Sequence, residues 1–396
     1  MVMTALYRSP VVSRLGAGPG VSLSHGYRHI FAVSDLHTDY EVNLEWVKQA
    51  APNGHADSVL IVAGDVSDRI GVFEETMRVL ADAFGAVFFV PGNHDLWVRR
   101  DGSEGSDSLQ KMARLNEICE SLGVLTTPQR VRMASGGCVS ICPLLSFHHM
   151  SFDTEPDIPH LRLPSARVTV TDFKATRWPD SLTLGEEELA EHMDEKNEEL
   201  LVSAARQACA LGRAGIEPIR SWAHAHDGAA SVLSFSHFLP RIELIPEKRF
   251  LVYPDLVKAV GSNALGRRVR ALRPDVHIFG HSHFGWDATL DGVRYVQAPL
   301  ALPKERERRP HSLAIGESGD LPTKLFDGNT GAYVKPLRAA WSDHYKRTER
   351  TPHDTFPAPW VVAHYASRSP SRLSLLPGGF KRAVPVQVRG HRKRAK

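Results

Sequence analysis

The stretch AVFFVPGNHD, residues 86–95, joins a short apolar run to a polar cluster. Its first five residues have the length and the β-branched and aromatic composition of a buried strand, and Pro91-Gly92 ends that strand. A Gly-Asn-His-Asp sequence arises by chance on the order of once in a thousand chains of this length. The stretch therefore predicts a strand that delivers polar side chains to a site at its carboxyl end.

Four further apolar runs end in the same way. They are Ile30–Val33 before Ser34-Asp35, Ser58–Ala63 before Gly64-Asp65, Ser231–Phe235 before Ser236-His237, and Val276–Phe279 before Gly280-His281-Ser282-His283. Helical patterns over Glu41–Ala50 and Val72–Ala83 alternate with the first strands, which predicts an α/β fold. In open α/β sheets the functional crevice lies outside the carboxyl ends of the strands. These polar clusters are therefore expected to converge in space.

The middle of the chain has a different character. A strand is expected over Cys138–Leu145, and it is followed by a cap-like insertion at about residues 146–230. This insertion contains a proline-rich loop and then a charged amphipathic helix over about Leu184–Leu211. Beyond it, Phe284–Leu290 and Val293–Gln297 flank an Asp-Gly pair, which predicts a hairpin.

Composition indicates a soluble protein. The 396 residues are 42% hydrophobic, and their apolar runs are far shorter than the roughly 20 residues that a transmembrane helix needs. Residues 1–28 lack acidic side chains and carry arginines and serines, so they are either a flexible arm or a weak transit peptide. We expect an intracellular, cytoplasmic location, with an organelle or the nucleus as the alternatives.

The C-terminal end differs in charge from the rest. Residues 331–396 carry 14 Lys+Arg and 3 Asp+Glu, net +11, which leaves 34 and 42, net −8, for residues 1–330. Such a basic, largely irregular tail is a solvated end, a nuclear address, or a contact for nucleic acid or an acidic surface.

Taken in order, the motifs resemble the calcineurin-like metallophosphoesterase superfamily over roughly residues 29–300. The resemblance implies a four-layer α/β (α+β) sandwich, in which two mixed β-sheets are flanked by helices, with a helical and loop insertion and a basic C-terminal tail. It also implies a dinuclear metal site. The metallophosphoesterase domain is then expected to span residues 29–330.

The ligand set follows from the motifs and the resemblance together. Asp65 follows a buried strand and is placed to bridge two cations, with one oxygen to each. The resemblance assigns Asp35, His37 and His283 to the first metal, and Asn93, His237 and His281 to the second. Mixed nitrogen and oxygen ligands favour Mn, Fe or Zn over Ca²⁺.

The expected reaction is hydrolysis of phosphate mono- or diesters, in which a hydroxide that bridges the metals attacks phosphorus. The leaving oxygen needs a proton, and His94, next to a ligand but not spent on a metal, is the expected general acid. Its carboxylate partner is expected to be Asp68, because Gly64–Arg69 resembles the Ser/Thr phosphatase branch. Ile70 departs from that branch, and Asp95 is the second candidate partner.

Two substrate-binding candidates remain open in the sequence. Arg69 either contacts phosphate or serves the surface or the start of a helix. His148 and His149, with Asp153, either line the pocket or bond within their own loop. Two alternative functions also remain: a catalytically weak metal-binding scaffold, and a nucleic-acid phosphodiesterase steered by the basic tail.

Overall fold

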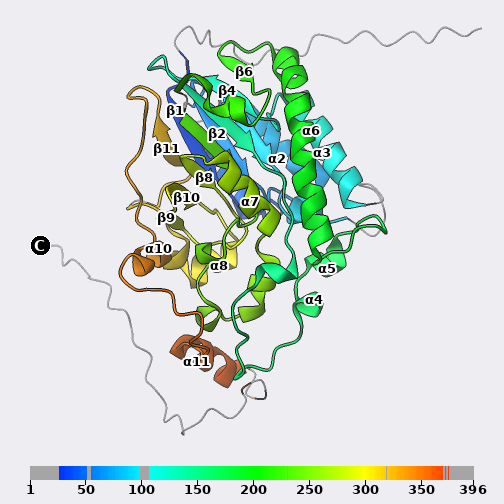
Figure 1. Ribbon diagram of the computed structural model, residues 1–396, viewed down its shortest axis with the longest axis vertical. Coiled ribbons are helices and arrows are strands. Elements are labelled where there is room, and N and C mark those ends of the chain that lie inside the picture. The colour runs from blue at the N-terminus through cyan, green and yellow to red at the C-terminus, as the bar shows by residue number, and fades with distance from the viewer. Residues whose placement is uncertain are drawn as a thin grey trace, which may run out of the picture.

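The computed structural model describes residues 26–50, 55–98, 107–229, 231–317 and 319–368, together with Ser371 and Leu373. Two mixed β-sheets and the helices around them make up this part of the chain (Figure 1). Most of the predicted N-terminal arm and the last 23 residues of the predicted tail, 374–396, lie outside the described residues. No helix in the described ranges combines the length and hydrophobicity needed to cross a membrane.

The first sheet has the strand order β12-β11-β1-β2-β3. Its strands are β1 (His29–Val33), β2 (Ser58–Ala63), β3 (Ala86–Val90), β11 (Thr323–Asp327) and β12 (Ala332–Tyr333). The three N-terminal strands run parallel, while β11 pairs antiparallel with both β1 and β12. The carboxyl ends of β1, β2 and β3 therefore meet at one edge.

The second sheet has the order β6-β4-β5-β7-β8-β10-β9. Its strands are β4 (Gln129–Arg132), β5 (Cys138–Pro143), β6 (Ile216–Pro218), β7 (Ser231–Phe235), β8 (Val276–Ile278), β9 (Trp286–Leu290) and β10 (Val293–Gln297). Strands β5, β7, β8 and β10 are parallel neighbours, and the outer strands are antiparallel. Both sheets are thus mixed.

Alternation along β2 explains the layers. Val59 and Ile61 face a core shared with β5 and β7 of the second sheet, where Ile141 and Leu233 pack against them. Leu60 faces the opposite way, into a core shared with the helices. Because both faces of the strand are buried, its sequence is a continuous apolar run rather than an alternating one.

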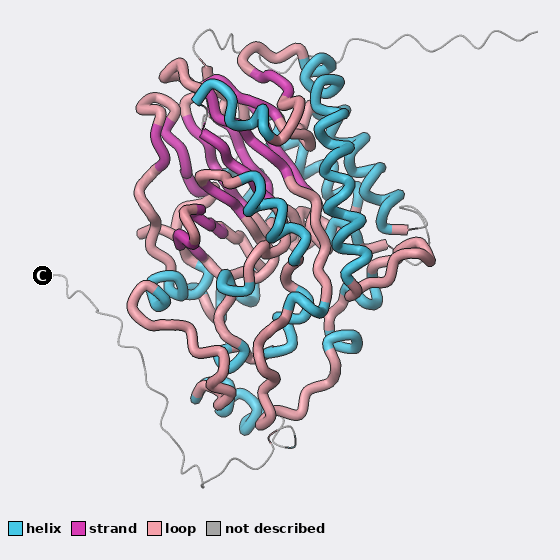
Figure 2. The backbone as a smooth tube through the Cα atoms, viewed as in Figure 1, coloured by secondary structure: helices cyan, strands magenta, loops and turns pink. Residues whose placement is uncertain are grey.

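Helices cover the outer faces (Figures 1 and 2). Those whose buried faces join the helix-side core of the first sheet are α1 (Glu41–Ala50), α2 (Ile70–Ala83), α3 (Ser108–Leu122) and part of α6 (Glu187–Leu211). α7 (Asn263–Leu272) packs Leu265 and Val269 against Phe279 and Tyr295 beside the second sheet. The predicted sandwich of two mixed sheets flanked by helices is confirmed.

The N-terminal strands begin and end close to where the sequence predicts them, and β2, β3 and β7 match at both ends. Within the insertion, short helices α4 (Ala166–Thr169) and α5 (Asp172–Ala175) interrupt the predicted loop. The last helices are α8 (Pro303–Arg308), α9 (Pro310–Leu313), α10 (Ala340–Tyr345) and α11 (Pro359–Arg368). The sequence patterns did not predict these four helices or β11.

Residues 332–368 pack against the preceding domain. Besides β12, Tyr345 donates a hydrogen bond to Glu247, and Nη1 of Arg350 donates to the carbonyl of Ile245 at 2.5 Å. Val361 and Tyr365 of α11 are 0% and 4% exposed. Residues on the two sides of position 330, where the sequence analysis placed a boundary, are therefore in direct contact.

Candidate metal centre

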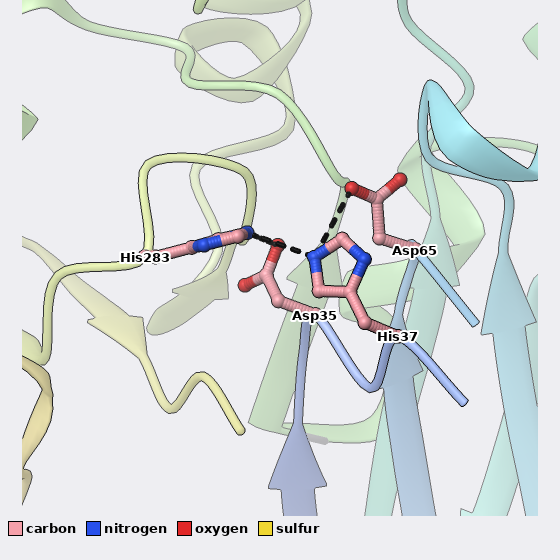
Figure 3. Close-up of side chains that lie close together, drawn as sticks. All are labelled: Asp35, His37, Asp65 and His283. Atoms are coloured by element: carbon pink, nitrogen blue, oxygen red, sulfur yellow. Dashed lines mark hydrogen bonds and ion pairs between the residues drawn. The ribbon is translucent and has the colours of Figure 1, made fainter. Parts of the chain in front are cut away.

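The predicted ligands of the first metal lie together (Figure 3). Nε2 of His37 is 3.0 Å from Nε2 of His283 and 3.8 Å from an oxygen of Asp65. Nε2 of His283 is also 3.4 Å from an oxygen of Asp35. Two imidazole nitrogens and two carboxylates, from the segments that follow β1, β2 and β8, therefore form one cluster.

The predicted ligands of the second metal form an adjoining group. Nε2 of His237 is 3.4 Å from the second oxygen of Asp65 and 3.2 Å from Nδ1 of His281. The side-chain oxygen of Asn93 lies 3.0 Å and 2.9 Å from these two imidazole nitrogens. Asp65 is common to both groups and presents a different oxygen to each.

The backbone at the ligands is strained. In the described part of the chain eight non-glycine residues have a positive φ, and five of them are predicted ligands. These five are Asp35 (56°), His37 (45°), Asp65 (56°), His281 (72°) and His283 (51°). Non-glycine residues hold this left-handed conformation where the surrounding structure imposes it, and such residues cluster at functional sites.

Glycines in the motifs allow close approach of these strands. A Cβ on Gly92 would lie 2.2 Å from an oxygen of Asp65 and 2.8 Å from the ring of His237. A Cβ on Gly64 would lie 2.5 Å from Nδ1 of His237, and its φ is +78°. Side chains at either position would displace ligands, so the glycines are needed for the geometry.

The hydrogen bonds around the second group test whether a cation fits. Nδ1 of His237 faces the carbonyl of Ala63 at 3.0 Å, so it carries the proton and Nε2 is an acceptor. The amide nitrogen of Asn93 donates to Asp172 at 2.8 Å, which leaves its oxygen as an acceptor. These two acceptors face each other at 3.0 Å with no proton between them. A cation bound by both would relieve that repulsion, so the residues fit a metal.

The shifted pKa values at the centre also fit a site for a cation. Burial, followed by the charges of Asp95 and Asp35, raises the pKa of Asp65 well above its usual value. Burial and the neighbouring His283 lower the pKa of His37 to about 3. Burial opposes protonation of His283, but the carboxylates of Asp35 and Glu305 raise its pKa to about 10. Buried carboxylates crowded together in this way are the environment that a bound cation stabilises.

Two acidic residues support the ligands and were missed by the sequence analysis. Glu305 in α8 lies 2.5 Å from Nδ1 of His283, which orients that imidazole toward the centre. Asp172 in α5 accepts from the amide of Asn93. Both lie in segments without a motif, and nothing in the sequence distinguishes them from other acidic residues nearby.

His94 lies beside the centre. Its Nε2 is 3.9 Å from an oxygen of Asp65, and its ring stacks on Trp97 with centroids 3.6 Å apart. The side chain is 24% exposed, whereas that of His237 is fully buried. Burial, followed by the charge of His37, lowers the pKa of His94 well below its usual value. His94 is thus free of the ligand groups and reachable from solvent.

Neither candidate partner of His94 contacts its ring among the described residues. The backbone N–H of Asp68 donates to Asp39 at 3.4 Å, while Asp95 accepts backbone N–H groups of Asp65, Val66, Ser67 and Gly92 at 2.8–3.0 Å. Asp95 therefore fixes the loop that carries the bridging ligand. The pairing of Asp68 with His94 has no support from this geometry.

The two substrate-binding candidates lie outside the cluster of ligands. Arg69 donates to the carbonyl of Asp39 at 2.9 Å, and its side chain is 45% exposed. His148 is 0% exposed, and its Nε2 lies 3.0 Å from Asp172. His148 thus has no exposed surface with which to touch a substrate in this conformation. Asp153 likewise pairs with the buried Lys248 at 2.8 Å.

Two mixed sheets with a buried His/Asp/Asn cluster at their strand ends define a protein of the metallophosphoesterase class. Residues 28–204 match the family model described as calcineurin-like phosphoesterase. The match to this family model, together with the fold and the ligand cluster, identifies residues 28–204 as a calcineurin-like phosphoesterase region.

Individual relatives are more distant. The chain is 25% identical over 291 residues to the acyl-carrier-protein phosphodiesterase PptH of Mycobacterium tuberculosis, covering 72% of this chain and 81% of that protein. Against the crystal structure of the phosphopantetheinyl hydrolase PptH from the same organism, the TM-score is 0.48 at 23% identity, covering 73% of this chain and 95% of that one. Against TT1561 of Thermus thermophilus the TM-score is 0.36 at 13% identity, covering 79% and 98%.

Proposed function

We propose that this protein hydrolyses phosphodiesters at a site of two metal ions that share Asp65. The observation that carries the proposal is the pair of ligand groups, each of which takes a different oxygen of that one carboxylate. Asp35, His37 and His283 would hold one ion, and Asn93, His237 and His281 the other. Mn, Fe or Zn would suit these mixed ligands.

When bound, such ions would supply Lewis acidity, which stabilises negative charge on the phosphoryl oxygens and lowers the pKa of a bound water to about 7. Other residues of the chain hold and orient the side chains that would bind these ions. Ala63 and Glu305 fix the imidazoles of His237 and His283 through hydrogen bonds to their Nδ1 atoms. The four backbone N–H groups bound by Asp95 keep the Asp65 loop in place.

His94 is the proposed general acid. Its Nε2 is beside the ligand groups, and its ring is held between Trp97 and His37, whose centroid is 4.6 Å away. Its lowered pKa leaves it neutral in the free protein, and the negative charge of a bound phosphodiester would raise that pKa. Protonated His94 would then donate Nε2–H to the leaving oxygen.

The substrate class is taken from the relative PptH. We propose a phosphodiester that joins a phosphopantetheinyl group to an acyl carrier protein, because the relative named for that carrier protein aligns over 72% of this chain. The leaving group of such a diester is a poor one, an alkoxide, which is the case in which a general acid is most needed.

Hydrolysis by metal-reconstituted protein tests the function. Wild-type protein with Mn²⁺ is expected to release a phosphopantetheinyl group from a carrier protein, as followed by mass spectrometry, and to cleave bis-p-nitrophenyl phosphate. Asp65→Asn should abolish both activities while the circular dichroism spectrum stays unchanged. Turnover by Asp65→Asn at the wild-type rate would contradict the site. Cleavage of the nitrophenyl ester without release from the carrier protein would contradict the substrate class.

A further inference from the structure

Asp172 reaches the site from the cap-like insertion. It is the first residue of α5, is 1% exposed, and both of its carboxylate oxygens are occupied. Oδ1 accepts from the amide nitrogen of Asn93 at 2.8 Å and from the indole nitrogen of Trp97 at 2.7 Å. Oδ2 lies 3.0 Å from Nε2 of His148. One buried side chain therefore connects a proposed metal ligand with the ring that stacks on His94.

The contact with Asn93 decides which end of the amide faces the metal. An ionised carboxylate only accepts hydrogen bonds, so Asp172 can bind the amide nitrogen but not the amide oxygen. The oxygen is then directed at His237 and His281. The indole N–H of Trp97 can only donate, and it also points at Oδ1 of Asp172, so this oxygen acts as an acceptor toward both groups.

The contact with Trp97 fixes the second group. The indole stacks on His94 at 3.6 Å with an interplanar angle of 29°. Its N–H donates to Asp172, so the indole cannot slide away without leaving a buried acceptor with one partner fewer. The place of the His94 ring therefore depends on a residue that lies 78 positions further along the chain.

The carboxylate itself is held firmly. Val98 donates its backbone N–H to the carbonyl of Ala175 at 2.7 Å, and Ser108 donates to the carbonyl of Arg177 at 2.7 Å. These bonds tie the segment that contains α5 to the chain on either side of residues 99–106. The insertion is thus anchored to the loop that follows Asn93.

We propose that Asp172 is a positioning residue that orients Asn93 toward the second metal and, through Trp97, sets the place of His94. This inference rests on the proposed function, because it takes Asn93 as a metal ligand and His94 as the general acid. It assigns to the insertion a part in the chemistry in addition to any part in substrate binding.

The test compares Asp172→Ala with Asp172→Asn. Alanine removes the acceptor. Asparagine keeps Oδ1 for Asn93 and Trp97, while its nitrogen can donate to Nε2 of His148, whose Nδ1 has no partner in the described ranges and can carry the proton. Lys174→Ala, at an exposed position two residues along α5, is the matched control.

Calorimetric titration of metal-free protein with Mn²⁺ alone is the first readout. Asp172→Ala should weaken one of the two binding steps by about 10–100-fold and leave the other unchanged, as expected when an outer partner of a ligand is lost. Asp172→Asn and Lys174→Ala should keep both steps. If Asp172→Ala does not fold, Asp172→Leu, which fills the same space without an acceptor, must show the same selective loss.

The second readout isolates the contact with Trp97. Trp97→Phe keeps an aromatic ring beneath His94 but removes the N–H that Asp172 accepts. It should leave Mn²⁺ binding unchanged and slow esters with poor leaving groups more than activated ones. Equal slowing of both ester types would contradict the path through Trp97.

The outcomes separate this inference from the proposed function. Wild-type protein that binds two Mn²⁺ and hydrolyses none of the esters contradicts the proposed function alone. Indistinguishable titrations of wild type and Asp172→Ala contradict the role of Asp172 alone, whatever the wild-type activity. Loss of the same binding step in both Asp172→Asn and Asp172→Ala also contradicts the role of Asp172. Asparagine keeps the oxygen that accepts from Asn93 and Trp97, so the loss could not then be due to a missing acceptor.

Discussion

Asp65 is the residue on which the centre depends, and the backbone around it is strained. Its φ of 56° and the same strained region at four other ligands each cost roughly 1–3 kcal/mol. The backbone N–H of His94 donates to the carboxylate of Asp65, and Gly64 and Gly92 leave room for the close approach of the neighbouring segments. The carboxylate therefore reaches both ligand groups. Strain and close approach at one point indicate selection for a site rather than for stability.

Gly92 tests this packing. Gly92→Ala places a Cβ 2.2 Å from Asp65, so the variant should bind less metal and should lose about 1–3 kcal/mol of unfolding free energy through overpacking. Urea unfolding and elemental analysis measure the two effects. Gly71→Ala in α2 is the control, because a Cβ there meets nothing within 4 Å and should stabilise the helix by about 0.5–1 kcal/mol. Normal metal content in Gly92→Ala would show that the site has room that the structure does not display.

Substitution of His94 tests whether this residue donates a proton without binding a metal. His94→Asn should keep the metal content of the wild type, because the ring belongs to neither ligand group. It should slow a phosphodiester with an alkoxide leaving group by about 10²–10⁴-fold and a nitrophenyl diester much less. Steady-state kinetics on both esters decide the matter, and an equal loss on the two would remove the proton-donor role.

At the scale of elements, the parallel strands were predictable because both of their faces are buried. A mostly apolar run that stops at a glycine, a proline or a polar pair leaves little freedom in where a strand ends, and β2, β3 and β7 match at both ends. The supporting residues were not predictable. Glu305 and Asp172 contact His283 and Asn93 across 22 and 79 positions, and only the tertiary fold brings them together.

Substitution of Glu305 in α8 tests whether a metal ligand needs a supporting carboxylate. Glu305→Ala removes the carboxylate that orients His283, so metal affinity should fall by about 10–100-fold. The same change removes the acceptor of the Leu302 backbone N–H and the ion pair with Arg309, so the helix should be less stable as well. Glu307→Ala, at an exposed position of the same helix, is the matched control. Mn²⁺ titration of the two metal-free variants compares them. Equal affinities would mean that His283 needs no outer partner.

At the scale of the whole molecule, the charge boundary and the structural boundary differ. Removing residues 331–396 would also remove β12, α10 and α11, whose buried Val361 and Tyr365 belong to the folded domain. Truncation after Leu373 takes away 7 Lys+Arg and no Asp or Glu while leaving every described element in place. Composition located the basic segment but could not show how much of it packs.

Two truncations therefore give opposite expectations. Loss of 374–396 should leave the melting temperature and phosphodiester hydrolysis unchanged, whereas loss of 331–396 should lower the melting temperature by several degrees, because buried apolar side chains are lost. Scanning calorimetry measures both. If the shorter truncation also abolished a steeply salt-dependent affinity for RNA or DNA, the segment would be a nucleic-acid contact rather than a solvated end.

The most direct test of the two-metal site is anomalous diffraction from crystals of the Mn²⁺-loaded protein, recorded near the manganese edge. Two peaks about 3.5–4 Å apart, with Asp65 between them and Asn93 beside the one nearer His237, are the predicted result. A single peak, or two peaks that do not share Asp65, would contradict it.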